Sequence, residues 1–592
     1  MSDRSMVFNS NDRSRWRHRR LADLGHGMLT PRFFLLSALT IFVGGSTLIP
    51  LSLLLWNSFK PVRLGKMADF TLQNFTLQNY SNALIDPGTI SMVGNSFVFA
   101  TGSTLVALVF GGIVAFIVER TNIAFKKIAH ALMLFPLIMP GVLKASAWVL
   151  LLNPNNGILN QLWFAFGFKS HLFNDKSVLS MIWVQGISMI PVTFLLLGAA
   201  FKMMDPALEE ASYAAGAGKI GTLRRITIRL MIPAIAGASL LNFTRALESF
   251  DIPLIMGLGA GYQMFSTAIY FALRILSPPG YGLALAYSVV LVAFATFGLL
   301  IYQRILSQDY RYRTVSGRAF RPTLIDLANW KYVLGVVVLS FGIIAFLLPV
   351  VVLLWASLLP YYQLPSGEAL SLLTVENYIA LPKKRIFMSA LANSVKLGAV
   401  VSVGGMILAV LISWTVLKLR PRGSQILDFL SFVSYGIPGV VAGFGFMIIF
   451  LSFPNPLYGT IWLVGFAYCI NLLPVATRFS HTGIIQMHQE LEEAASTCGA
   501  GFVTTLRTIT MPIIFPYLAA GALFLFLLTM RLLSLVAVLY TPDSIVFPVL
   551  IVQLHDTGFI PQLSALGIMM IVVLSVLTLA VRRLVQDKVI SG

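Results

Sequence analysis

Long apolar runs separated by shorter polar segments dominate the chain. A helix needs about 20 apolar residues to cross a bilayer, and in lipid its backbone must satisfy its own hydrogen bonds. Twelve segments meet this requirement: 33–58, 92–118, 128–152, 178–200, 233–257, 281–303, 332–357, 391–416, 426–452, 459–477, 516–540 and 563–582. The pattern predicts an all-α polytopic membrane protein with about 12 transmembrane helices. Pro-Gly pairs interrupt the third and ninth runs and are expected to kink them.

Composition supports this fold class. The chain has 592 residues, of which 57% are hydrophobic and 11% charged, and its mean hydropathy is +0.83. Soluble domains carry roughly 25% charged residues, so this chain cannot cover itself with polar surface. Its net charge of +19 could suggest nucleic acid as a partner. The basic residues lie between the apolar runs, however, which indicates a lipid bilayer and no nucleic acid.

The distribution of Lys and Arg predicts the orientation of the chain. Most of them fall in the segments on the same side as the two termini, and the positive-inside rule places that side in the cytoplasm. We therefore expect a multi-pass protein of the bacterial inner membrane with both termini cytoplasmic. The expected divisions are a basic arm (1–32), a first transmembrane domain (33–303), a linker (304–331), a second transmembrane domain (332–582) and a tail (583–592).

The second half of the chain repeats the first. Three landmarks give the spacing: the Asn-Tyr pair at 79 recurs at 377, the Pro-Gly pair at 140 recurs at 438, and Pro191 recurs at 474. The offset falls from 298 to 283 after the second landmark, so the first half carries an insertion between 141 and 191. The outer loop near 153–176 can accept it. Six spans in each half predict two homologous halves related by a pseudo-two-fold axis along the membrane normal.

The strongest repeat lies in the cytoplasmic loops after the fourth and tenth spans. The first reads EEASYAAGAGKIGTLRRITI from Glu209 and the second EEAASTCGAGFVTTLRTITM from Glu492, with 11 of 20 positions identical. Alanine and glutamate favour helix, and glycine takes the left-handed position that ends a helix at little cost. Each loop is therefore predicted to be a helix, a glycine turn and a second helix. A short exposed helix of this kind can dock into a cleft on another protein.

These loops resemble the EAA signature of ABC importer permeases, which is Glu-Ala-Ala, three residues, Gly, nine residues and Ile-x-Leu-Pro. The second loop has Met511 in place of Leu and otherwise matches at Glu493, Ala494, Ala495, Gly499, Ile509 and Pro512. The first loop matches at Glu210, Ala211, Gly216 and Ile226, and departs at Ser212, Ile228 and Arg229. Arg229 stands where the family has proline.

The resemblance implies a division of labour between subunits. In this family the loop is a coupling helix that seats on a nucleotide-binding subunit, so two copies of an ATP-binding subunit are expected, carrying ATP and Mg. A soluble binding protein is expected to deliver substrate from the other side. The chain itself is expected not to be an enzyme and to hold no cofactor or metal. Its GAGKI stretch lacks a phosphate-binding pattern, because Tyr213 and Ile220 stand where the pattern needs Gly and Ser or Thr.

Two further stretches indicate a subgroup of the ABC importer permeases. ALESFDIPLIMG at 246–257 and RTVSGRAFRP at 313–322 resemble the fused permeases of iron(III), thiamine, polyamine and phosphonate importers. Fusion of both halves favours iron(III). An ion-coupled secondary transporter is the rival interpretation, because it also uses repeats and intramembrane charges, but it would not need two coupling loops.

Ionisable residues at membrane depth are candidate pathway or gate residues, because they are costly there. Arg245, Glu248 and Asp251 follow one another at i, i+3 spacing in the fifth predicted span, which would place them along one helix face. The repeat aligns Glu248 with Arg531, so one hypothesis pairs these two across the pseudo-two-fold axis. The other is local neutralisation of Arg245 by Glu248. Lys144, in the third span, is expected to snorkel towards the interface.

Overall fold

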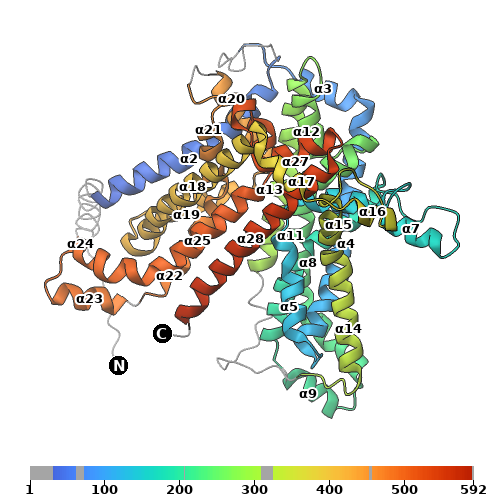
Figure 1. Ribbon diagram of the computed structural model, residues 1–592. Coiled ribbons are helices and arrows are strands. Elements are labelled where there is room, and N and C mark those ends of the chain that lie inside the picture. The colour runs from blue at the N-terminus through green and yellow to red at the C-terminus, as the bar shows by residue number, and fades with distance from the viewer. Residues whose placement is uncertain are drawn as a thin grey trace, which may run out of the picture.

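The computed structural model describes residues 31–61, 73–205, 207–307, 324–452, 456–487 and 489–589. The described part is helical, with one isolated β-bridge between Thr121 and Ile325. Two helical arms diverge from a shared outer region, as Figure 1 shows. The predicted basic arm and most of the predicted linker lie outside the described residues.

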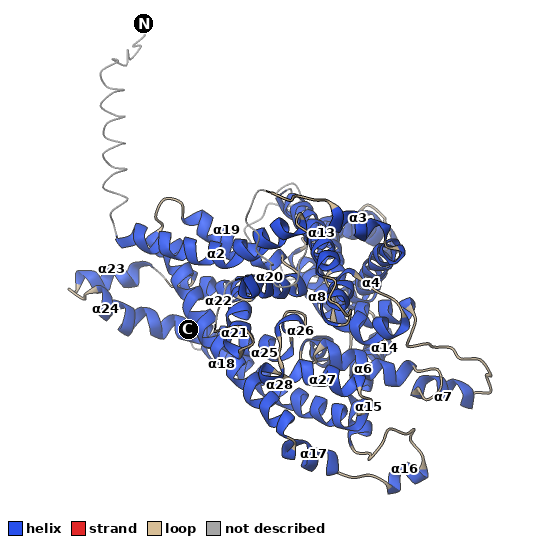
Figure 2. Ribbon diagram, turned by 90° about the horizontal axis from the view of Figure 1, so that it is seen from above, coloured by secondary structure: helices blue, strands red, loops and turns tan. Residues whose placement is uncertain are grey.

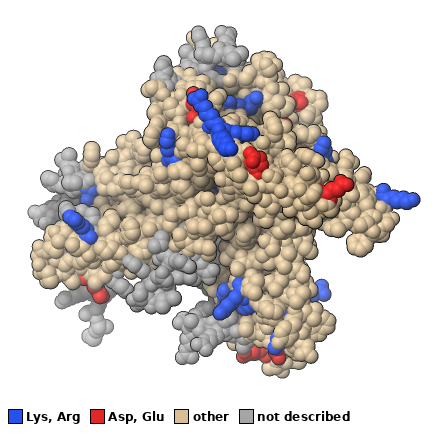
Figure 3. Space-filling model, viewed as in Figure 1, with Lys and Arg blue, Asp and Glu red and all other residues tan. Residues whose placement is uncertain are grey.

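The helices of the two halves follow the predicted order. The first half contains α2 (Pro31–Ser58), α4 (Pro87–Arg120), α5 (Lys126–Leu134), α6 (Gly141–Leu152), α8 (Val178–Met203), α11 (Ile228–Leu247) and α13 (Tyr281–Ser307). The second contains α14 (Trp330–Gly342), α15 (Leu348–Ser357), α18 (Arg385–Trp414), α19 (Ser424–Val433), α20 (Gly439–Ser452), α21 (Ile461–Asn471), α22 (Leu473–Ile485), α25 (Met511–Arg531) and α28 (Ile560–Val589). Within the described residues, nine helices can span a membrane, or up to 12 if each bent pair counts as one span. Charged side chains are sparse along both arms on the face shown in Figure 3.

The Pro-Gly pairs break their spans instead of merely kinking them. The two parts of the third span meet at 104° and those of the ninth at 108°. Proline ends the first segment because it offers no N–H to the helix. Glycine opens the second because another side chain fills the space that a Cβ would need: the Asp251 carboxylate over Gly141, and Ser534 over Gly439.

The first span of each half packs on the other half. Helix α2 lies against α19 and α20, whereas α14 and α15 lie against α5 and α6. Figure 2 shows α2 beside α19, on the far side of the molecule from α15. The halves are therefore interlocked through an exchange of their first helices.

A matched pair of hydrogen bonds at the starts of two equivalent helices confirms the repeat. Helix α12 (Phe265–Arg274) begins where the Phe265 N–H donates to Ser96 Oγ at 3.1 Å, and α27 (Phe547–Asp556) begins where the Phe547 N–H donates to Ser394 Oγ at 2.8 Å. Arg274 then joins the halves by donating to two carbonyl oxygens of the second half, those of Val538 and Tyr540, each at 2.6 Å.

Candidate coupling loops and intramembrane charges

Both loops form the predicted helix, glycine turn and helix. In the first, α9 (Ala207–Ala214) is followed by Gly216, whose φ is +85°. The Ala217 N–H donates to the Ser212 carbonyl at 3.0 Å. In the second, α23 (Gln489–Thr497) is followed by Gly499, whose φ is +79°. The Ala500 N–H donates to the Ala495 carbonyl at 3.0 Å. This is the hydrogen-bond pattern with which glycine ends helices.

Replacing both turn glycines by alanine should weaken the loops. A left-handed conformation costs an L-residue roughly 1–2 kcal/mol, so the doubly substituted Gly216→Ala, Gly499→Ala protein should bind its ATP-binding subunit several-fold more weakly in a pull-down titration. The control is Gly218→Ala, Gly501→Ala in the same turns, where nothing lies within 4 Å and φ is not positive. Equal binding by the two double variants would contradict the prediction.

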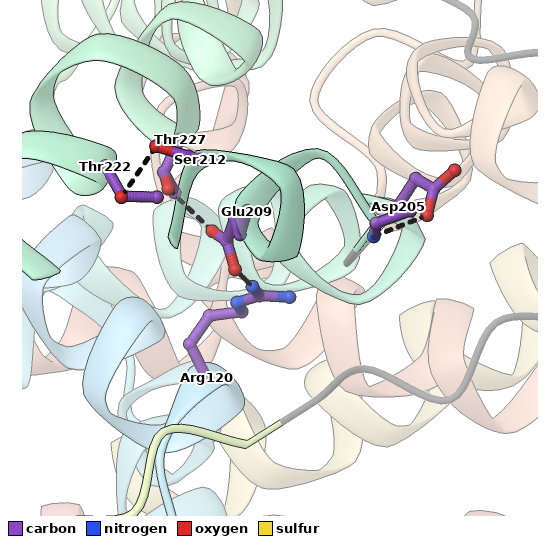
Figure 4. A network of polar contacts seen from close by, with 7 residues as sticks. Arg120, Asp205, Glu209, Ser212, Thr222 and Thr227 are labelled. Carbon is purple, nitrogen blue, oxygen red and sulfur yellow. Dashed lines mark hydrogen bonds and ion pairs between the residues drawn. The ribbon is translucent and has the colours of Figure 1, made fainter. Parts of the chain in front are cut away.

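A buried polar cluster holds the first loop against the arm, as Figure 4 shows. Glu209 is 6% exposed and accepts a charge-assisted bond from the fully buried Arg120, at the end of α4. Its other carboxylate oxygen accepts from Thr227 Oγ1 at 2.6 Å. The Ser212 and Thr222 hydroxyls, 2.9 Å apart, close the hairpin. Glu209 thus connects the loop to both α4 and the start of α11.

The two acidic residues of the first motif have different environments. Glu210 is exposed, as are Ala211 and Gly216, whereas Glu209 is buried. The side chain of Ile220, beyond the turn, is 82% exposed. The loop therefore presents small and apolar groups on its exposed surface, and such a surface is suited to packing on a protein partner.

The second loop repeats this backbone. Glu493 and Ala494 are exposed and Ala495 is buried, while the side chain of Glu492 lies outside the described residues. Pro512 stands in the first turn of α25, where proline is well tolerated. A π turn precedes α25 at Leu506–Thr510, and its counterpart at Leu223–Thr227 precedes α11. The exit of the first loop therefore keeps the same form with Arg229 in place of proline.

The predicted fifth and eleventh spans end earlier than expected. Helix α11 stops at Leu247 and α25 at Arg531. The chain becomes helical again at Asp251, and Pro253 stands in the first turn of this new segment, where the missing N–H of proline costs little. The prediction that Arg245, Glu248 and Asp251 share one helix face is therefore wrong: the chain turns between the first two residues and the third.

The break separates the candidate pathway residues into two groups. Arg245 and Glu248 line a cavity of about 370 Å³ between the halves. Asp251 instead lies over Gly141 and interacts electrostatically with Lys144 and Arg531. We refer to Lys144, Asp251 and Arg531 as the buried charge triad.

The hypothesis that Glu248 pairs with Arg531 is not supported by the structure. Arg531 donates to the Leu137 carbonyl, at the broken third span of the first half, and its acidic neighbour is Asp251. Arg245 is the charged neighbour of Glu248, which agrees with the alternative of local neutralisation. Lys144 lies within the triad and does not snorkel.

Sequence reasoning missed Arg120 and Arg478. Arg120 ends an apolar span, where a basic residue is expected as a flank, and only the folded loop brings Glu209 to it. Arg478 lines the same cavity as Arg245. The repeat could have indicated Arg478, because it aligns this residue with Leu195, and a charge that replaces leucine in one half needs an explanation.

Two homologous halves, each with a helix–glycine turn–helix loop at the end of its arm, are typical of the membrane subunit of a transporter. The chain belongs to the family described as binding-protein-dependent transport system inner membrane component, whose sequence model matches residues 102–312 and 402–591. It is thus an ABC importer permease with two fused halves, a multi-pass protein of the inner membrane.

Relatives of known type fall in the expected subgroup. The ferric transport system permease protein FbpB of Actinobacillus pleuropneumoniae is 26% identical over 508 residues, covering 84% of this chain and 72% of the relative. The putative ferric transport system permease protein FbpB 1 of Haemophilus influenzae is 26% identical over 80% of this chain and 74% of its own length. The putative 2-aminoethylphosphonate transport system permease protein PhnV of Salmonella typhimurium is 28% identical over 43% of this chain and 94% of the relative.

Proposed function

We propose that this chain is the permease of an iron(III) importer. The observation that carries the proposal is similarity to two permeases named for ferric transport over 84% and 80% of the chain, including both halves. Shorter relatives match a single half, as PhnV does. The two relatives named for ferric transport thus match most of the fused chain.

The partners follow from the two loops. Each loop seats one copy of an ATP-binding subunit, which hydrolyses ATP with Mg, and a soluble binding protein presents the substrate at the outer loops. Both termini lie in the cytoplasm. Figure 1 supports this orientation, because α2 begins and α28 ends on the same side as the loops.

A phosphonate is the second candidate substrate, because PhnV is 28% identical over 257 residues. Thiamine and polyamines remain alternatives through the subgroup resemblance alone. Ion-coupled transport is disfavoured, because the family is defined by dependence on a binding protein.

Reconstituted transport tests the proposal. Proteoliposomes holding the permease with its ATP-binding subunit, supplied with the binding protein and radioactive iron(III), should accumulate iron only when ATP is enclosed. The Gly216→Ala, Gly499→Ala protein should lose most of this uptake, and the Gly218→Ala, Gly501→Ala protein should keep it.

Two results would contradict the assignment. ATP-driven uptake of 2-aminoethylphosphonate, thiamine or a polyamine without uptake of iron would show that iron(III) is not the substrate. Uptake driven by an ion gradient in the absence of the ATP-binding subunit would show that the protein is a secondary transporter.

A further inference from the structure

We propose that the cavity between the halves binds a small ligand through an oxyanion group, a carboxylate, phosphate or phosphonate, and that Arg245 and Arg478 recognise this group. The inference rests on the proposed importer function and adds the chemistry of its cargo.

The cavity lies where the two halves meet. Helices α11 and α13 of the first half form one wall, and α19, α22 and the turn Ser434–Gly436 of the second half form the other. Its volume of about 370 Å³ is in the range of small-molecule sites. Apolar atoms form most of its surface, so charged side chains are unusual in the lining.

Two arginines, Arg245 and Arg478, line this space. Both Arg245 and Arg478 are exposed, although they belong to membrane helices. Arg245 Cζ lies 4.3 Å from the centroid of the Tyr435 ring, and Arg478 Cζ lies 5.2 Å from that of Phe432. Stacking on an aromatic face orients a guanidinium and leaves its N–H edge available. That edge matches the two oxygens of a carboxylate or phosphate.

The charge balance of the wall favours an anion. Glu248 is the single carboxylate in the lining, against two guanidinium groups, and its charged neighbour is Arg245. Arg478 has no carboxylate partner among the ion pairs of the described residues. One positive charge is therefore left in an apolar surround, where an oxyanion would be held strongly.

The internal repeat shows that the fold does not require these charges. Each of the three residues aligns with a leucine in the opposite half: Arg245 with Leu528, Tyr435 with Leu137, and Arg478 with Leu195. Equivalent backbone positions thus hold leucine without loss of the helix arrangement. Because ionisable groups are costly at membrane depth, their presence in one copy alone indicates a ligand.

The site also constrains how iron(III) would pass. Two guanidinium groups repel a bare trivalent cation. Under the proposed function, iron therefore enters the cavity bound to an oxyanion ligand.

Direct binding tests the inference without transport. The permease with its ATP-binding subunits in lipid nanodiscs is titrated calorimetrically with citrate, ferric citrate and 2-aminoethylphosphonate, and with putrescine as a cationic control. At least one oxyanion should bind and putrescine should not. Arg245→Leu and Arg478→Leu should each weaken that binding at least about tenfold, whereas Arg245→Lys and Arg478→Lys should retain part of it. Arg385→Gln, an exposed arginine at the start of α18, should change nothing.

Three results would overturn the site. They are no oxyanion binding by the unsubstituted complex, equal binding by well-folded leucine variants, and a tightly held anionic phospholipid that native mass spectrometry finds in the complex and misses in the leucine variants. The last would assign the arginines to a lipid. Oxyanion binding that depends on both arginines, together with no iron uptake, would keep the site and reject iron(III).

Discussion

Replacing Arg120 with leucine is expected to abolish most ATP-driven uptake, although Arg120 lies inside the arm and not on the docking surface. The substitution leaves the Glu209 carboxylate buried, with the Thr227 hydroxyl as its remaining hydrogen-bond donor among the described residues. Removing one partner of a buried ion pair costs about 3–5 kcal/mol, which is enough to release the loop from the ends of α4 and α11. The melting temperature and the uptake rate in proteoliposomes should both fall.

Two further variants separate this effect from a general loss of charge. Arg120→Leu combined with Glu209→Leu should recover much of the melting temperature, because replacing a buried pair by apolar groups is often neutral. Glu210→Gln changes the neighbouring exposed acid. It should change the free energy of unfolding by less than about 0.5 kcal/mol. A Glu210→Gln defect as large as that of Arg120→Leu would refute the anchoring role of Glu209.

Replacing Asp251 with serine is expected to be the most damaging single change within the membrane. It leaves Lys144 and Arg531 with no acidic neighbour in the buried charge triad. A charge at the bilayer centre costs about 3 kcal/mol on insertion scales, so the variant should be strongly destabilised and nearly inactive in transport. Thermal unfolding in detergent and uptake by the same preparation measure the two effects.

The second half supplies the matched rescue. Its equivalents of Lys144 and Asp251 are Ala442 and Ser534, so the double change Lys144→Ala, Asp251→Ser gives the first half the chemistry of the second. The double variant should be more stable than Asp251→Ser alone. If the double variant were the less stable of the two, the triad would not be a charge-balanced unit.

The features that sequence predicted are those set by local physics. Apolar run length located the spans, and two constant offsets located the repeat. The left-handed glycines Gly216 and Gly499 could be predicted because few other residues take that conformation at low cost. The coupling-loop motif lies in contiguous residues, so no tertiary information was needed to find it.

The intramembrane charges were harder to place, because their partners depend on where helices break. Spacing of i, i+3 implies a shared face only if the helix is continuous, and α11 ends between Arg245 and Asp251. Pro253 is compatible with a new helix start near it, but it does not give the direction in which the chain turns. The neighbours of Asp251 come from α6 and α25, so only the packing of three distant segments brings the triad together.

The exchange of first helices ties assembly to synthesis of the whole chain. Helix α2 is made first among the described helices, but its packing surface on α19 and α20 is made only after residue 424. Residues 1–307 expressed alone would leave that face of α2 against lipid. Fusion supplies the two halves in a one-to-one ratio and in the same region of the membrane. The face of α2 can therefore always pack on the second half of its own chain.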